Sequence, residues 1–285
     1  MPPRLVSLGI LLYWVVAASS LIRRDVLPGM GFVGPPDLRT IARAEDNAEP
    51  SRWSVEVIDN PLSPELRRAV GTATTQSTRD AKGWVIMTSR VEFSAGGLLK
   101  GTPLPSQSDE RLEILSTYRV DPSGNLRWFQ ASVRTASDPE ELVQVVGTLK
   151  KEGMELVSSS RLPIFNQKRT IPYQPRGLVQ NALGPFDRLP NLQVGQRWET
   201  QVISPITGRV DTVRVEVTRR SVIQWNNNPV PTLEVVHHMT PLSSRTWVRP
   251  DGFVLRQEVP FPFVKLVLER LPDRATTPNT EVSDR

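Results

Sequence analysis

The most regular feature of the chain is an alternation of apolar and polar residues with a period of two, which begins at Trp53. It is clearest in residues 213–217, where valines alternate with charged residues, and it returns in residues 264–268. Successive side chains of a β-strand point to opposite faces, so each such strand presents one face to a core and the other to water or a groove. The pattern predicts an antiparallel sheet covered on one side.

Further strands are expected where the same alternation recurs between turn residues. They cover residues 72–76, 84–93, 112–120, 126–135, 142–149, 154–162, 197–203, 232–238 and 244–248. Few long helices fit the rest of the chain. The best candidates are residues 64–69, with Ser63 as the N-cap and a proline at the first helical position, and residues 177–183. The predicted fold is therefore mainly β, with one or two short helices.

An internal echo indicates that the β-domain has two similar halves, residues 53–175 and 185–272. Residues 120–127 and residues 248–256 each read as a strand, a Pro/Gly turn and a return strand with a Leu-Arg pair. Chance is the alternative, because such turns are common in β proteins. Residues 273–285 show no apolar alternation and are predicted to be a disordered tail.

The N-terminal segment Leu5–Ile22 carries no charge over 18 residues and is bounded by arginines. As a helix it would cover about 27 Å, close to the thickness of the hydrocarbon core of a bilayer. We expect residues 1–24 to form a single-pass transmembrane helix that precedes the sheet, with a cleaved signal peptide as the alternative. Residues 25–52, rich in Pro and Gly, are predicted to be a neck that holds residues 53–272 off the membrane.

The orientation of this segment is open between two interpretations. More Lys and Arg residues follow the segment than precede it, which by the positive-inside rule would keep the β-domain in the cytoplasm. Large domains can nevertheless translocate despite flanking charge, and a lone N-terminal apolar segment is typical of an export signal. We therefore expect a cell-membrane protein whose β-domain is extracytoplasmic, in the periplasm.

The apolar content, the charge distribution and the lack of cysteine exclude several classes of function. The 285 residues are 38% apolar, enough for a real core. The net charge is +5, but the basic residues are dispersed singly along the predicted strands. That distribution is typical of solvated faces, so we expect no nucleic-acid partner. The chain has no cysteine, which excludes disulfides, thiolate metal sites and cysteine nucleophiles.

Three stretches of the C-terminal half carry a family resemblance: LQVGQRW at 192–198, DTVRVEV at 211–217 and TWVRPDGFVLR at 246–256. They resemble uncharacterised bacterial envelope β-domains related in fold to the lipoprotein carriers LolA and LolB, domains sometimes found beside transglutaminase-like modules. The resemblance covers residues 189–271 well and residues 53–169 loosely. It implies a curved antiparallel sheet or half-barrel with an apolar concave face, and it carries over no catalytic residue. The chain lacks a carrier's lipobox cysteine, and its expected tether would prevent shuttling.

The two histidines, His237 and His238, are neighbours at the end of a predicted strand. They should point to opposite faces and cannot easily share one metal ion. We expect one packed at the edge of the core and one in solvent, with a lone base as the alternative. No Gly-rich phosphate loop, nucleophile-elbow serine or His-Glu-x-x-His motif occurs. No catalytic residue, cofactor or metal ion is therefore predicted.

Aromatic residues supply the remaining candidates for a site. The candidate hydrophobic-face residues are Trp53, Trp84, Trp198, Trp247, Phe261 and Phe263. Most tryptophans are expected in the core, because Trp suits a half-buried pleated surface. The alternative is a concave apolar face that holds an acyl chain or a hydrophobic peptide.

The leading interpretation is a non-enzymatic, membrane-anchored domain that binds a lipid, a hydrophobic peptide or an envelope protein partner. A structural or accessory subunit of an envelope complex is the alternative. A hydrolase that uses His237 or His238 is the third interpretation.

Overall fold

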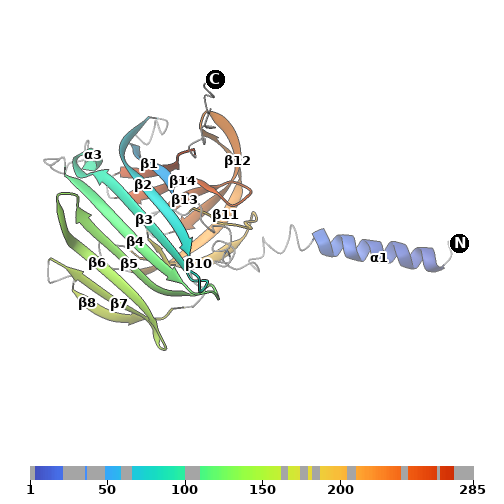
Figure 1. Ribbon diagram of the computed structural model, residues 1–285. Helices are drawn as coiled ribbons and strands as arrows, with labels where there is room; N and C mark the ends of the chain where they lie inside the picture. Colours follow the sequence, from blue (N-terminus) through green and yellow to red (C-terminus); the bar gives the residue numbers. More distant parts are fainter. Residues whose placement is uncertain are drawn as a thin grey trace, which may run out of the picture.

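The computed structural model describes the β-domain almost throughout, together with an N-terminal helix (Figure 1). The described residues are 4–21, 36, 49–58, 66–99, 110–161, 166–173, 179–181, 187–203, 210–238, 243–261 and 264–272. They form the helices α1 (Arg4–Leu21) and α3 (Ala95–Leu99) and 15 strands in one sheet.

The first eight strands lie in the first part of the domain. They are β1 (Ser51–Ile58), β2 (Arg67–Arg79), β3 (Val85–Ser94), β4 (Arg111–Val120), β5 (Leu126–Thr135), β6 (Asp138–Lys150), β7 (Gly153–Ser160) and β8 (Gln167–Ile171). The remaining strands are β9 (Val179–Asn181), β10 (Arg197–Ile203), β11 (Val210–Trp225), β12 (Asn228–His238), β13 (Ser243–Val248), β14 (Val254–Phe261) and β15 (Val264–Arg270).

The sheet consists of two meanders, which are joined because the first strand of the domain, β1, pairs with the last, β15. Its order runs from β8 down to β1, and then from β15 down to β9. The seam is the antiparallel pair β1–β15, in which Trp53 lies opposite Arg270. Only β9, parallel to β10, departs from antiparallel pairing among the described strands. The sheet curls so that the second meander lies behind the first in Figure 1. The predicted mainly β fold with a curved antiparallel sheet is thus confirmed.

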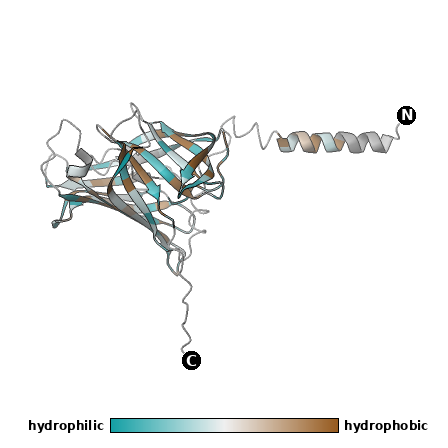
Figure 2. Cartoon of the chain, turned by 90° about the horizontal axis from the view of Figure 1, so that it is seen from above, coloured by the Kyte–Doolittle hydropathy of each residue, from teal (hydrophilic) through white to brown (hydrophobic). Residues whose placement is uncertain are grey.

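The period-two alternation places one face of the sheet on the core, and this face is called the inner face. Along β1, Trp53, Val55 and Val57 are buried, whereas the residues between them are half-buried. Teal and brown alternate along the strands in Figure 2 in the same way. The register carries the inner face across the seam, where Val55 lies opposite Leu268.

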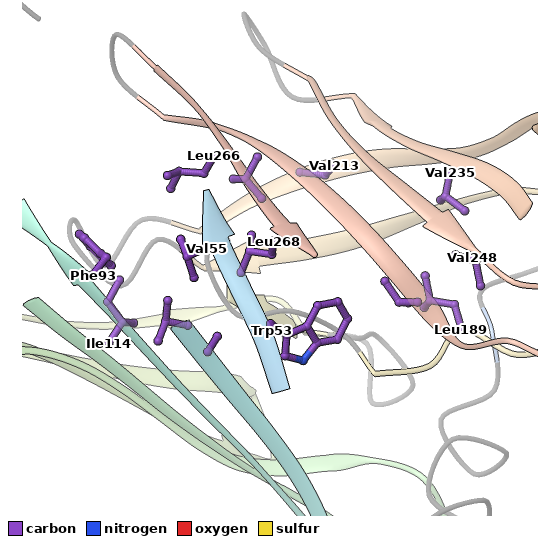
Figure 3. Close-up of a cluster of buried hydrophobic side chains, with 14 of the residues drawn as sticks. Trp53, Val55, Phe93, Ile114, Leu189, Val213, Val235, Val248, Leu266 and Leu268 are labelled. Carbon is purple, nitrogen blue, oxygen red and sulfur yellow. The ribbon is translucent and has the colours of Figure 1, made fainter. Parts of the chain in front are cut away.

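Apolar side chains from both meanders pack together on the inner face. Phe93 and Ile114 of the first meander and Val213 and Val235 of the second belong to one cluster of buried side chains (Figure 3). A second cluster, around Phe129, lies farther along the first meander. The inner face is therefore the core of the domain.

A buried polar cluster also crosses the seam. The guanidinium of Arg270 donates to the hydroxyl of Ser51 at 2.7 Å and to Asp187 at 3.4 Å. Thr75 donates to the same carboxylate at 2.6 Å and accepts from the indole of Trp53 at 3.2 Å. These bonds join β1, β2 and β15 to the segment that precedes β10, so they fix how the two meanders meet.

The two short helices expected inside the domain are wrong where the structure describes them. Residues 67–69 continue β2, because Arg68 and Ala69 pair with β1 beyond a bulge. Residues 179–181 form β9 beside β10. Pairing with a neighbouring strand has overridden local helix signals at both places. The predicted tail, residues 273–285, lies outside the described residues.

The N-terminal helix α1 lies apart from the sheet in Figure 1. Its apolar side chains Leu12, Tyr13 and Trp14 are each more than 60% exposed. Across the described part of the chain, no helix combines the length and the apolar character that a bilayer crossing requires. The transmembrane anchor therefore stays a prediction from the sequence.

Candidate functional site

A groove of about 470 Å³ lies across the strands of the first meander. The residues that line it come from β2 to β6 and from the chain just before β1. They are Pro50, Thr74, Thr75, Gln76, Thr88, Ser89, Arg90, Leu115, Ser116, Thr117, Gln130, Ser132 and Glu141. Hydroxyl and amide side chains make up most of this set, so the groove is a hydrogen-bonding surface.

The strand register places most of the residues that line the groove on the face opposite the core, called the outer face, whereas Thr75, Ser89 and Ser116 belong to the inner face. Two rows of side chains cross it from β2 to β5. The first row is Thr74, Arg90, Leu115 and Ser132, and the second row is Gln76, Thr88, Thr117 and Gln130. Paired residues in an antiparallel sheet share a face, so each row is one continuous strip of side chains.

Charged residues close one end of the groove. The Arg90 guanidinium contacts Glu92 at 2.7 Å and also the carboxylate of Glu113, which Arg134 contacts from the other side. The hydrogen bond from Arg134 to Glu113 raises the pKa of this arginine. Glu113 is buried although it lies on the outer face, because its two arginine partners cover it. Arg90 is thus held in place and largely neutralised.

One tryptophan lies beside the groove on the same face. Trp128 is two residues before Gln130 on β5 and is paired with Arg119 and Thr148. It is half-buried. The outer face of the first meander thus combines hydroxyls, amides and one aromatic ring.

The structure does not gather the predicted hydrophobic-face residues on one accessible surface. Trp53 and Trp198 lie on the inner face and are 0% and 8% exposed. Trp247 is 8% exposed but packs on the opposite face, with Ile223 and Leu255.

Two of the other three predicted residues, Trp84 and Phe261, lie next to or at the end of a strand. Trp84 lies in the turn before β3, where the guanidinium of Arg119 lies 5.9 Å from its ring. Phe261 ends β14, and Phe263 lies outside the described residues.

The two histidines point to opposite faces, as predicted. His237 is buried on the inner face opposite Ser244, whereas His238 is exposed. Burial, together with the neighbouring His238, lowers the pKa of His237 to about 4, so it is neutral near pH 7. The imidazole of His238 lies 4.0 Å from the carboxylate of Glu216. The two imidazoles therefore do not form one site.

Several inner-face polar atoms have no hydrogen-bond partner in the described structure. They include His237 Nε2, Thr246 Oγ1 and Gln257 Oε1 on three adjacent strands, β12 to β14. Thr246 lies directly opposite Gln257. Such atoms destabilise a core by their lost hydration unless an ordered water satisfies them.

Carboxylates in the turns cap backbone amides, as expected for β-hairpins. Asp121 accepts from the amides of Ser123 and Asn125, each at 2.9 Å, and from Arg127 at 2.7 Å. Partial burial alone would raise the pKa of Asp121, but the bonds from Asn125 and Arg127 lower it. Within the described ranges, no group of three or more histidines and carboxylates is placed to hold a metal ion.

Comparisons with known proteins give structural neighbours but no family. No protein-family model matches the chain, and no similar curated protein was found. A β-barrel-like protein of the domain of unknown function DUF1849 from Brucella abortus is similar in structure, with 10% identity and a TM-score of 0.49 over 78% of this chain and 95% of that chain.

A DUF1089 family protein from Pseudomonas aeruginosa is similar with 14% identity and a TM-score of 0.34, over 66% of this chain and 89% of that chain. Neither neighbour is described as a lipoprotein carrier. The resemblance of residues 189–271 to the lipoprotein-carrier fold therefore stays a prediction.

Proposed function

We propose that the protein is a non-catalytic binding module held at a membrane, and that its ligand lies in the groove on the outer face of β2 to β6. The observation that carries this proposal is the groove itself. It is rigid, because its floor is a continuous antiparallel ladder, and its side chains offer many donors and acceptors to a ligand.

The packing of the inner face argues against a hydrophobic ligand. An acyl chain or an apolar peptide would need an open apolar face. Trp53, Val57 and Val215 are fully buried by the side chains of the two meanders. A ligand could enter there only if the core separated, which would cost much of the stability of the domain.

The membrane tether and the extracytoplasmic location rest on the sequence of Leu5–Ile22. The exposed apolar side chains of α1 support the tether, because the β-domain leaves them uncovered. Extraction of membranes at alkaline pH tests it: the full chain should stay in the membrane pellet, whereas a chain without residues 1–24 should be released. Release of the full chain would contradict the tether. Protease access to the β-domain in spheroplasts would establish the side of the membrane.

The groove is tested with a matched pair of double variants. Thr117 and Gln130 are paired across β4 and β5 in the groove, and Thr117→Val with Gln130→Met removes their hydrogen-bonding groups at nearly constant volume. Thr170→Val with Gln167→Met makes the same chemical change on the edge strand β8. The full chain is purified from native membranes in each form, and co-purifying glycans, lipids and proteins are measured by mass spectrometry.

The expected result is a molecule that accompanies the wild type and the β8 double variant and is depleted from the groove double variant. Equal recovery of every co-purifying molecule from all three forms would overturn the groove as the binding site.

A second candidate function is an accessory subunit of an envelope complex, as the sequence also allowed. The filled inner face favours it, since a domain packed on its own side chains can serve as a rigid scaffold. In this case the molecule lost from the groove double variant would be a stoichiometric protein.

A further inference from the structure

We infer that the ligand of the outer-face groove is an uncharged, polyhydroxylated polymer, that is, a neutral glycan chain. This inference rests on the proposed function and names the chemical class of its ligand. It comes from the lining of the groove, from its position in the sheet and from the ring beside it.

The lining suits a ligand rich in hydroxyl groups. Three accessible hydroxyl side chains, Thr74, Thr88 and Thr117, and two amides line the two rows across β2 to β5, and Ser132 adds a buried hydroxyl. Hydroxyls donate and accept, and amides do both through separate atoms. A ligand that carries many hydroxyls, each able to donate and accept, can satisfy such a surface without a fixed charge.

The charge balance argues against an ionic ligand. Arg90 and Glu141 are the only charged residues among those of the lining that the structure describes, and their formal charges cancel. The guanidinium of Arg90 is already paired with Glu92 and Glu113. An anionic ligand would have to displace these carboxylates, and a cationic ligand would have only Glu141 to contact in the groove.

The position of the groove argues against a peptide. Peptides commonly add a strand to a free sheet edge or insert apolar side chains into pockets. The groove lies over β2 to β6, whose backbones are paired on both sides, and the sheet edges are β8 and β9. Its apolar members are Pro50 and Leu115. Neither a free ladder nor an apolar pocket is therefore offered here.

The dimensions and the aromatic ring fit an extended chain. Neighbouring strands lie about 4.8 Å apart, so the groove spans about 19 Å from β2 to β6. Trp128 lies on the same face as the second row, two residues before Gln130 along β5. An indole presents an apolar surface with a polar edge, which suits the C–H face of a sugar ring flanked by hydroxyls.

The test is isothermal titration calorimetry of the full chain with maltohexaose and with chitohexaose, in a detergent without a sugar headgroup. The groove double variant, Thr117→Val with Gln130→Met, should lose about thirtyfold in affinity, as expected for two lost hydrogen bonds. The β8 double variant, Thr170→Val with Gln167→Met, should stay within about twofold of the wild type. Binding of either hexasaccharide with this pattern supports the inference.

Three results would overturn it. The first is that neither hexasaccharide binds the wild type. The second is that the groove double variant binds as well as the wild type. The third is that a hexapeptide of alternating Gly and Ser binds the groove more tightly than both sugars. In each case the proposed function stands if native purification still shows a molecule that the groove double variant loses, and it fails if no such molecule is found.

Discussion

Phe129 and Gly147 face each other across β5 and β6, with the phenyl ring lying where a side chain at position 147 would be. Phe129 is fully buried in the second core cluster, so the ring has no room to withdraw. Gly147→Ala should therefore lower the free energy of unfolding by about 3 kcal/mol through overpacking. Urea denaturation would measure this loss. In a Phe129→Leu background the same substitution should cost much less, and an equal cost would contradict the contact.

Glu113 is the buried centre of the charged end of the groove, between Arg90 and Arg134. In Glu113→Gln, one carboxylate oxygen becomes an amide NH2 group, which repels the guanidinium that it faces. Arg90 and Arg134 also lose the negative charge that they share. Glu113→Gln should lower the free energy of unfolding by about 2 kcal/mol. The exposed Glu140 provides the control, and Glu140→Gln should change stability by less than about 0.5 kcal/mol. Equal effects of the two substitutions in urea denaturation would show that the Glu113 cluster contributes nothing.

Burial of neutral His237 makes the stability of the domain depend on pH. Its pKa is lowered from 6.5 to about 4, so below pH 6.5 the unfolded chain takes up a proton that the folded chain does not. Stability is complete above pH 6.5 and falls by roughly 3 kcal/mol as the pH drops to 4.

Urea denaturation at several pH values would show this loss. His237→Gln should remove most of it, whereas His238→Gln on the exposed face should keep it. An unchanged pH slope in His237→Gln would contradict the assignment.

Thr246 carries a buried hydroxyl with no hydrogen-bond partner in the described structure. Thr246→Val keeps the shape and removes the unsatisfied group, so it should raise the free energy of unfolding by about 1 kcal/mol. Thr170→Val, on the exposed side of β8, should be close to neutral. A loss of stability in Thr246→Val, measured by thermal or urea unfolding, would mean that an ordered water or a ligand uses this hydroxyl.

Much of the strand layout could be predicted because local patterns determine it. The bounds of β5 and β10 match the predicted residues 126–135 and 197–203. The turn at 121–125 also has the same backbone hydrogen bonds as the turn at 249–253, each with a glycine at positive φ in fourth place. The Asp-Pro-x-Gly and Arg-Pro-Asp-Gly sequences carry that information directly.

The remaining features depend on contacts that no local pattern contains. β8 is polar and charged, and β9 has three residues, so neither shows an apolar alternation. The seam joins residues more than 200 positions apart, such as Trp53 and Arg270, and only the folded chain brings them together.

The groove was missed for the same reason. In any single strand from β2 to β5, the polar positions have the pattern of a solvated face. A signal was present, because the outward residues of successive predicted strands are mostly Thr, Ser and Gln. Only the register shows that they form two continuous rows.

The central claim is that the domain works through its polar outer face while its inner face is closed. The absence of native cysteines allows a direct measurement: Thr88→Cys in the groove and Ala73→Cys in the core of the inner face, each labelled with a small maleimide under native conditions. We predict rapid labelling of Thr88→Cys and labelling of Ala73→Cys that is at least about a hundredfold slower until urea unfolds the domain. Similar native rates at the two positions would show that the inner face is open and would contradict the account.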